Sequence, residues 1–156
     1  MSDAIHSTIA TWVMPILKAL QPYGDSAEVL ALVGIDAKCI EDANQRIPFD
    51  KMQDLWQQAE RISDDDCIGL EAIKHITPTS FHGFIHAYQA SSTLRESIER
   101  VVKFSDVVST AVRLELKEDA EQATISMHLV APVTGLSIHA ADAFTSLLAK
   151  NIQEAT

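Results

Sequence analysis

The chain has 156 residues, of which 47% are hydrophobic and 22% are charged, and its formal net charge is −10. This length and composition predict one globular domain with a sizeable single core. The acidic balance, without any stripe of lysine and arginine, argues against DNA binding by this chain, because proteins hold phosphate backbones through basic side chains.

The sequence shows no sign of membrane insertion or export. No apolar run reaches the roughly 20 residues that span a bilayer, and the N-terminus lacks the basic and apolar pattern of a signal peptide. We expect Cys39 and Cys67 to fill space as reduced thiols rather than to form a bridge or bind a metal. These features predict a cytoplasmic protein that has no membrane partner.

The N-terminal part predicts short helices. Apolar residues recur at helical spacing over 5–21, and Pro15 predicts a kink or break there because it removes an amide donor. Ser26 is the expected cap of a second helix. That helix should end at Gly34, since glycine readily adopts the left-handed conformation that follows many helices.

Residues 46–70 contain the clearest helical pattern. Pro48 favours a helix that starts directly after it, and Asp50 is the expected N-cap. Apolar residues then recur at spacings of three and four and define one buried face: Met52, Leu55, Trp56, Ala59 and Ile62. We expect Ser63 to end this helix and the following aspartates to cap another through Cys67 and Ile73.

Two further helices are predicted after a loop at 77–80. Residues 83–90 favour a short helix that can bury aromatic side chains. Thr93 and Glu96 have the spacing of a capping box, which predicts a longer helix over 94–108.

The period of the pattern changes near the C-terminus. Alternating apolar and polar residues predict strands at 112–117 and 125–129, paired as an antiparallel hairpin. Helical spacing returns over 137–153. The sequence therefore predicts an α+β fold, a mostly helical single domain with an antiparallel β-hairpin near its C-terminal end.

Five segments carry a family resemblance in their order and separation: Gly34–Asp36, Arg46–Asp50, Ser63–Leu70, Phe81–Gly83 and Ser92–Glu96. With the amphipathic helix between the second and third, they resemble the N-terminal regulatory domain of AraC-type bacterial transcription regulators. The resemblance covers roughly residues 28–150. It is nearest to the arabinose-binding-like domain of ornithine-utilisation-type regulators, and none of the segments is a catalytic signature.

The resemblance implies a domain that senses a small-molecule effector, forms a homodimer and controls a helix-turn-helix DNA-binding domain. That DNA-binding segment normally follows and is absent here. We therefore expect either a fragment of a regulator or a short relative whose sheet is completed by another copy. Neither a cofactor nor direct contact of this chain with nucleic acid is expected.

The residues expected to line an effector pocket are aromatic or polar, since such pockets combine apolar walls with a few polar groups. They are Arg46, Trp56, Phe81, Phe84, His86, Tyr88 and Phe104. Aromatic residues at helical spacing are also typical of an ordinary core, so the pattern allows both interpretations.

Three other constellations could carry chemistry. His82 and His86 have a spacing that suits zinc, but no third ligand stands at a recognisable distance. Cys67 or Ser80 could pair with a histidine, although no nucleophile motif surrounds either residue. The acidic run after Ser63 is explained by favourable charge at a helix start. We predict no metal site and no catalytic residue.

Two alternatives to the regulatory domain stay open. One is a stand-alone small-molecule-binding or protein-interaction module. The other is a small enzyme or a haem-type gas sensor that uses one of the histidines. A reading frame that continues into a basic helix-turn-helix segment would favour the regulator, and a coloured purified protein would favour the haem sensor.

Overall fold

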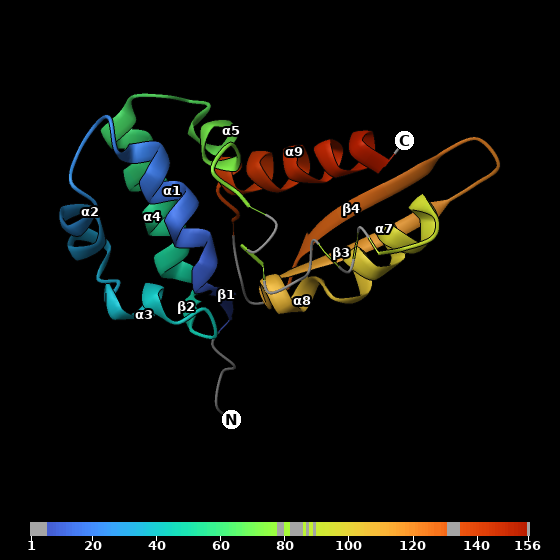
Figure 1. The fold of residues 1–156 in the computed structure, drawn as a ribbon, viewed down its shortest axis with the longest axis horizontal. Coiled ribbons are helices and arrows are strands. Elements are labelled where there is room, and N and C mark those ends of the chain that lie inside the picture. Colours follow the sequence, from blue (N-terminus) through green and yellow to red (C-terminus); the bar gives the residue numbers. More distant parts are fainter. Residues whose placement is uncertain are drawn as a thin grey trace.

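The computed structural model describes residues 6–77, 80–81, 86, 88, 90–130 and 135–155. Within these residues the elements follow in the order β1 (Ser7–Ile9), η1 (Ala10–Trp12), α1 (Val13–Leu20), α2 (Ser26–Val33), α3 (Lys38–Glu41), β2 (Arg46–Pro48), α4 (Phe49–Ser63), α5 (Ile68–Ile73), α7 (Leu94–Lys103), α8 (Ser105–Val108), β3 (Val112–Glu118), β4 (Ala123–Leu129) and α9 (Ile138–Ala155). The prediction of a mostly helical α+β fold with a hairpin near the C-terminal end is confirmed (Figure 1).

The main core lies in the helical part of the molecule, where α1, α4 and α5 pack together. The stripe predicted on α4 forms its centre, with Leu55 and Ala59 fully buried. The helix ends at Ser63 as predicted, and Asp64 follows in the left-handed conformation with φ 51°. Amphipathic spacing was a sound guide here because one face of α4 is covered along its whole length.

The N-terminal segment differs from the prediction. A helix over 5–21 is wrong for its first part, since β1 pairs antiparallel with β2 and places Thr8 opposite Ile47. The predicted break at Pro15 is also wrong. Because α1 starts at Val13, Pro15 lies in the first turn, where its missing amide hydrogen would have no partner within the helix.

Two predicted caps are displaced by one residue or more. Asp25, not Ser26, caps α2 by accepting a hydrogen bond from the Ala27 amide at 2.9 Å. Helix α4 begins at Phe49 after Pro48, so Asp50 lies in the first turn and is not the N-cap. Adjacent polar residues compete for the same unpaired amides, which sequence alone does not resolve.

The predicted antiparallel hairpin forms, and its register places Leu114 opposite Met127 and Leu116 opposite Ile125. Helix α7 packs against β3, and its first turn contains the predicted capping box. The Glu96 amide donates to Thr93 Oγ1 at 3.1 Å, while the Glu96 carboxylate accepts from the Ser92 amide at 2.9 Å.

The helix predicted over 94–108 is divided into α7 and α8 at Phe104. The last helix, α9, is longer than predicted and runs from α5 along the hairpin to the C-terminus (Figure 1). It therefore contacts both the helical core and a second, smaller apolar cluster around Val101 and Leu114. The short helix predicted over 83–90 lies mostly outside the described residues.

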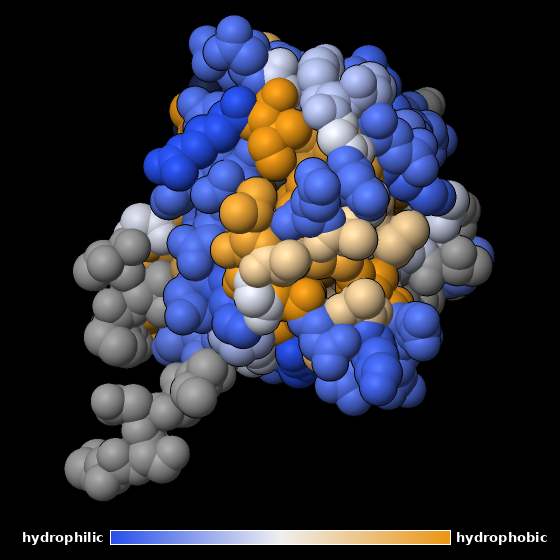
Figure 2. Space-filling model, turned by 90° about the vertical axis from the view of Figure 1, so that its left-hand side faces the viewer, coloured by the Kyte–Doolittle hydropathy of each residue, from blue (hydrophilic) through white to orange (hydrophobic). Residues whose placement is uncertain are grey.

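Hydrophobic side chains also reach the surface. Figure 2 shows such side chains gathered on the side of the molecule where α2 and α3 lie, and the exposed hydrophobic residues include Leu32 of α2 at 67% and Met14 of α1 at 42%. Among the described residues, no helix combines the length and apolar character needed to cross a membrane.

Candidate functional site

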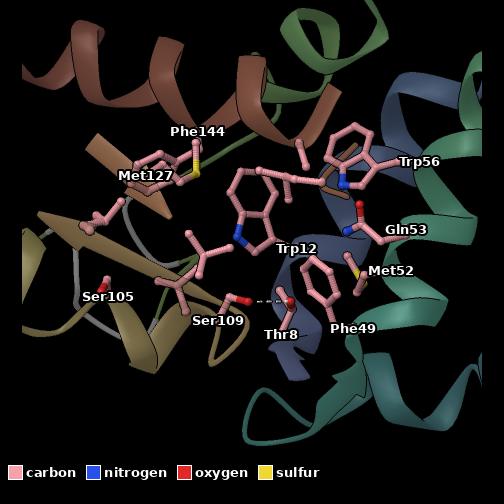
Figure 3. Close-up of a pocket in the computed structure, with 15 residues that line it drawn as sticks. Thr8, Trp12, Phe49, Met52, Gln53, Trp56, Ser105, Ser109, Met127 and Phe144 are labelled. Atoms are coloured by element: carbon pink, nitrogen blue, oxygen red, sulfur yellow. Dashed lines mark hydrogen bonds between the residues drawn. The ribbon is translucent and has the colours of Figure 1, made fainter. Parts of the chain in front are cut away.

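A cleft of about 80 Å³ lies between the helical part and the hairpin, and we call it the aromatic cleft (Figure 3). Its walls come from β1, η1, α4, α8, both hairpin strands and the start of α9. The described lining residues are Thr8, Trp12, Phe49, Met52, Gln53, Trp56, Ser105, Val108, Ser109, Val112, Leu114, Met127, Leu136, Ala140 and Phe144.

Trp12 lies in the middle of the cleft (Figure 3). Its ring meets Trp56 edge to face, with centroids 6.4 Å apart and planes at 63°, and it packs against Phe81 at 4.9 Å. Such aromatic contacts favour a defined ring geometry beyond the burial of area. The two indoles form a stable wall on the helical side.

The opposite wall comes from the hairpin and α9. Met127 of β4 and Phe144 of α9 lie together across the cleft from Trp56 (Figure 3). Methionine adapts its shape through three rotatable bonds, so this wall can follow the outline of a bound molecule. One wall is therefore fixed by aromatic rings that pack against each other, and the other is adaptable.

The polar side chains in the lining are few and already hydrogen-bonded. Thr8 Oγ1 donates to Ser109 Oγ at 3.2 Å, which links β1 to the loop after α8. Ser105 Oγ donates to the Val102 carbonyl at 3.1 Å. Gln53 Oε1 accepts from the Ser137 amide at 2.5 Å.

Arg46 spans the boundary between the two parts just outside the cleft. Its guanidinium donates to Ser7 Oγ at 2.8 Å and to the Val107 carbonyl of α8 at 2.9 Å. Burial lowers the pKa of Arg46 and the charge of Asp106 opposes that shift, so the side chain stays a cation. Arg46 thus holds β1, β2 and α8 together.

Residues 24–151 match a family model, that of the arabinose-binding domain of AraC transcription regulators, N-terminal. The chain belongs to this family. The match confirms the resemblance seen in the sequence, with nearly the same bounds. It makes the chain an N-terminal, ligand-binding regulatory domain. No curated protein matches the sequence.

The structure distributes the residues expected to bind the effector over several places in this regulatory domain. Trp56 lines the aromatic cleft, and Phe81, which is 2% exposed, lies behind Trp12. Arg46 holds the boundary together and is not among the described residues that line the cleft. Phe84 lies outside the described residues.

The remaining expected residues lie apart from the cleft. Tyr88 lines a separate hollow of about 250 Å³ beside the start of α7. Burial raises the pKa of its hydroxyl, which has no hydrogen-bond partner among the described residues. His86 is exposed. Phe104 is 43% exposed, with the Lys103 ammonium 5.3 Å from its ring centre.

A buried histidine stands behind the Trp56 wall. His139 of α9 is 2% exposed, and its Nε2 lies 3.0 Å from the Glu60 carboxylate of α4. Its ring centre is 6.5 Å from that of Trp56. This contact joins α9 to α4 next to the cleft.

Within the described ranges, no group of three or more histidine, cysteine, aspartate or glutamate side chains is arranged to hold a metal. Cys39 and Cys67 are free thiols there, and Cys67 is exposed rather than packed in the core. His82, half of the sequence-based zinc candidate, lies outside the described residues.

Several lining residues were visible in the sequence only as core positions. Trp12, Met52, Met127 and Phe144 belong to the periodic apolar patterns that predicted the helices and the hairpin. A pattern shows that a side chain turns inward, but not whether the space it meets is filled. The polar residues Gln53 and Ser109 gave no signal at all.

Proposed function

We propose that this chain is the effector-sensing and dimerisation domain of a transcription regulator, and that an effector in the aromatic cleft acts on a DNA-binding domain joined to it. The position of the cleft carries the proposal. A molecule bound there contacts the helical part through Trp12 and Trp56, and the hairpin through Met127. It can therefore favour one arrangement of the two parts over another.

The contacts that span the same boundary are the ones such a change would alter. The Thr8–Ser109 hydrogen bond and the bonds of Arg46 to α8 cross it on the side of β1. Both involve residues beside the cleft. A ligand that widens the cleft would move α8 and β3 against β1, which is a short route from binding to a change of shape.

The site of sensing is tested by a thermal-shift screen of small metabolites on three proteins. The wild type is compared with Ala140→Leu, which fills the cleft from α9, and with Ala149→Leu, which adds the same atoms at an exposed position of that helix. Effectors should raise the melting temperature of the wild type and of Ala149→Leu but not of Ala140→Leu. Effectors that raise the melting temperature of Ala140→Leu as much as that of the wild type would show that they bind outside the cleft.

The regulatory output is tested with a chimera. The chain is fused to a DNA-binding domain that acts only as a dimer, in front of a reporter gene. The fusion should regulate the reporter and respond to the hits of the screen. The unfused chain should not shift duplex DNA, because its net charge is −10 and DNA affinity depends on basic side chains.

A further inference from the structure

We propose that the effector is a small, uncharged and mainly apolar molecule with an oxygen acceptor such as a carbonyl, and not a sugar. The inference rests on the proposed sensing function and names the ligand class for the same cleft. It differs from what the family description suggests for this domain. The chemistry of the lining decides it.

The first argument is the apolar character of the walls. The large side chains that meet in the cleft are indole rings, phenyl rings and thioethers, among them Trp12, Trp56, Phe144 and Met127. A sugar carries a hydroxyl on nearly every carbon, and each one must keep a hydrogen bond when it leaves water. Apolar walls would leave most of these hydroxyls without partners.

The second argument is the state of the polar groups. Thr8, Ser105 and Ser109 use their hydroxyls in contacts within the protein, and the Gln53 oxygen accepts from Ser137. Within the described part of the chain, the groups of the lining that make no protein hydrogen bond are donors. They are the indole N–H groups of Trp12 and Trp56 and the side-chain amide nitrogen of Gln53. Donors call for an acceptor on the ligand.

The third argument is charge. None of the described residues that line the cleft is acidic or basic. A carboxylate or an ammonium bound there would lose its hydration without gaining an opposite charge. Arg46 could in principle neutralise a carboxylate, but its guanidinium already donates hydrogen bonds to Ser7 and Val107.

The fourth argument is size. The cleft holds about 80 Å³, whereas an engineered protein cavity of roughly 150 Å³ is known to accept benzene. The ligand is therefore small, and the cleft must open somewhat to admit it. The adaptable wall around Met127 allows this opening.

Both tryptophans of the chain line the cleft, so emission excited selectively from tryptophan reports on this site. We suggest three probes of similar size: methyl hexanoate, hexanoate and L-arabinose. Methyl hexanoate should change the emission saturably, with a dissociation constant of about 1 mM or lower. Hexanoate and arabinose should bind at least about tenfold more weakly, because they carry a charge or many hydroxyls.

Two filling variants with matched controls confirm the place of binding. Ala140→Leu and Val108→Leu project into the cleft and should each weaken methyl hexanoate binding by about tenfold or more. Ala149→Leu and Val107→Leu, which change exposed positions on the same two helices, should bind as the wild type does. Two independent filling positions keep the test decisive where one variant folds poorly, as far-ultraviolet circular dichroism would reveal.

Each result decides the matter. Tighter binding of arabinose or hexanoate, blocked by the filling variants, would overturn the ligand class while leaving effector sensing in the cleft intact. No response to methyl hexanoate at about 10 mM would also overturn it, since such walls should retain an apolar ester at that concentration. The thermal-shift screen of metabolites would then remain the test of whether the chain senses an effector in the cleft.

Discussion

Gly69 of α5 packs against the backbone of His139 in α9, so closely that a Cβ atom at position 69 would lie 2.3 Å from the His139 carbonyl oxygen. Only glycine permits this approach of the two helices. The next residue of α9, Ala140, lines the aromatic cleft. The crossing at Gly69 therefore fixes one wall of the site from behind.

Gly69→Ala should lower the free energy of unfolding by about 1–3 kcal/mol, because the clash is with backbone and α9 must move. The better helix propensity of alanine offsets part of this. Gly24→Ala is the control, since its Cβ would meet its nearest neighbour, Ile62 Cγ2, at an ordinary 3.9 Å. Urea denaturation of both variants measures the difference. Equal denaturation midpoints for Gly69→Ala and the wild type would show that the contact between α5 and α9 accommodates a Cβ atom without loss of stability.

Trp56→Ala should cost about 3–5 kcal/mol of stability, as the removal of a large buried side chain does. Trp56 is 2% exposed, and it supports Trp12 and faces His139. Tyr23→Ala removes an aromatic ring that is 50% exposed and should change stability by no more than about 0.5 kcal/mol. A denaturation midpoint for Trp56→Ala close to that of Tyr23→Ala would contradict the central place of Trp56.

The pH dependence of stability is expected to depend partly on Glu96. The Ser92 amide and the Arg100 guanidinium hydrogen-bond its carboxylate and lower its pKa. A lowered folded-state pKa adds stability above the unfolded-state pKa, and this is lost as the pH falls through the folded-state value.

Glu96→Gln keeps a capping-box side chain but removes the charge. The variant should be less stable than the wild type at about pH 7, and the difference should shrink as the pH falls below the ordinary glutamate pKa and through the lowered folded-state pKa. Glu99→Gln, at an exposed position of α7, is the matched control. Denaturant midpoints over this range test the expectation, and a difference that persists unchanged in acid would mean that the amide, not the lost charge, weakens the cap.

The elements that sequence predicted well are those whose pattern is set by local burial. The stripe of α4, the capping box at Thr93 and the antiparallel hairpin all follow from residues close in the chain. The strand β1 was missed because its partner, β2, lies about 40 residues away, and pairing at that distance leaves no local period. The effect of Pro15 was also predicted wrongly. It depends on where the helix starts, and α1 starts at Val13 because the residues before it form β1 and η1.

The candidate site shows the same division. Trp56 was identified as a possible pocket residue because it is aromatic and central in a strong stripe. The cleft itself arises where η1, α4, α8, the hairpin and α9 meet, and that meeting depends on tertiary packing. Aromatic residues such as Phe81 and Phe104 have the same sequence character as Trp56. Only the fold shows that Phe81 is buried behind the cleft, that Phe104 is exposed and that Trp56 lines the cleft.

Self-association is the last prediction, and the hairpin provides its physical basis. In the described part of the chain, β3 and β4 pair only with each other, so their outer edges present unpaired backbone groups. Near the tip, Leu116 and Ile125 face each other and are only partly buried. Regulators on paired half-sites need a fixed relation between two DNA-binding units, for which a two-fold dimer is the commonest solution.

We predict a dimer by light scattering at micromolar concentration. Ile125→Lys should shift it towards monomer, because the charge replaces an apolar contact, whereas Thr124→Lys, the exposed neighbour on β4, should not. Loss of the dimer in Leu32→Lys instead would move the interface to the hydrophobic surface of α2 and α3. A monomer mass that stays unchanged as the protein is concentrated would rule out the association. The exposed hairpin edges would then be protected from pairing by the charged side chains that border them, such as Lys117 and Glu118.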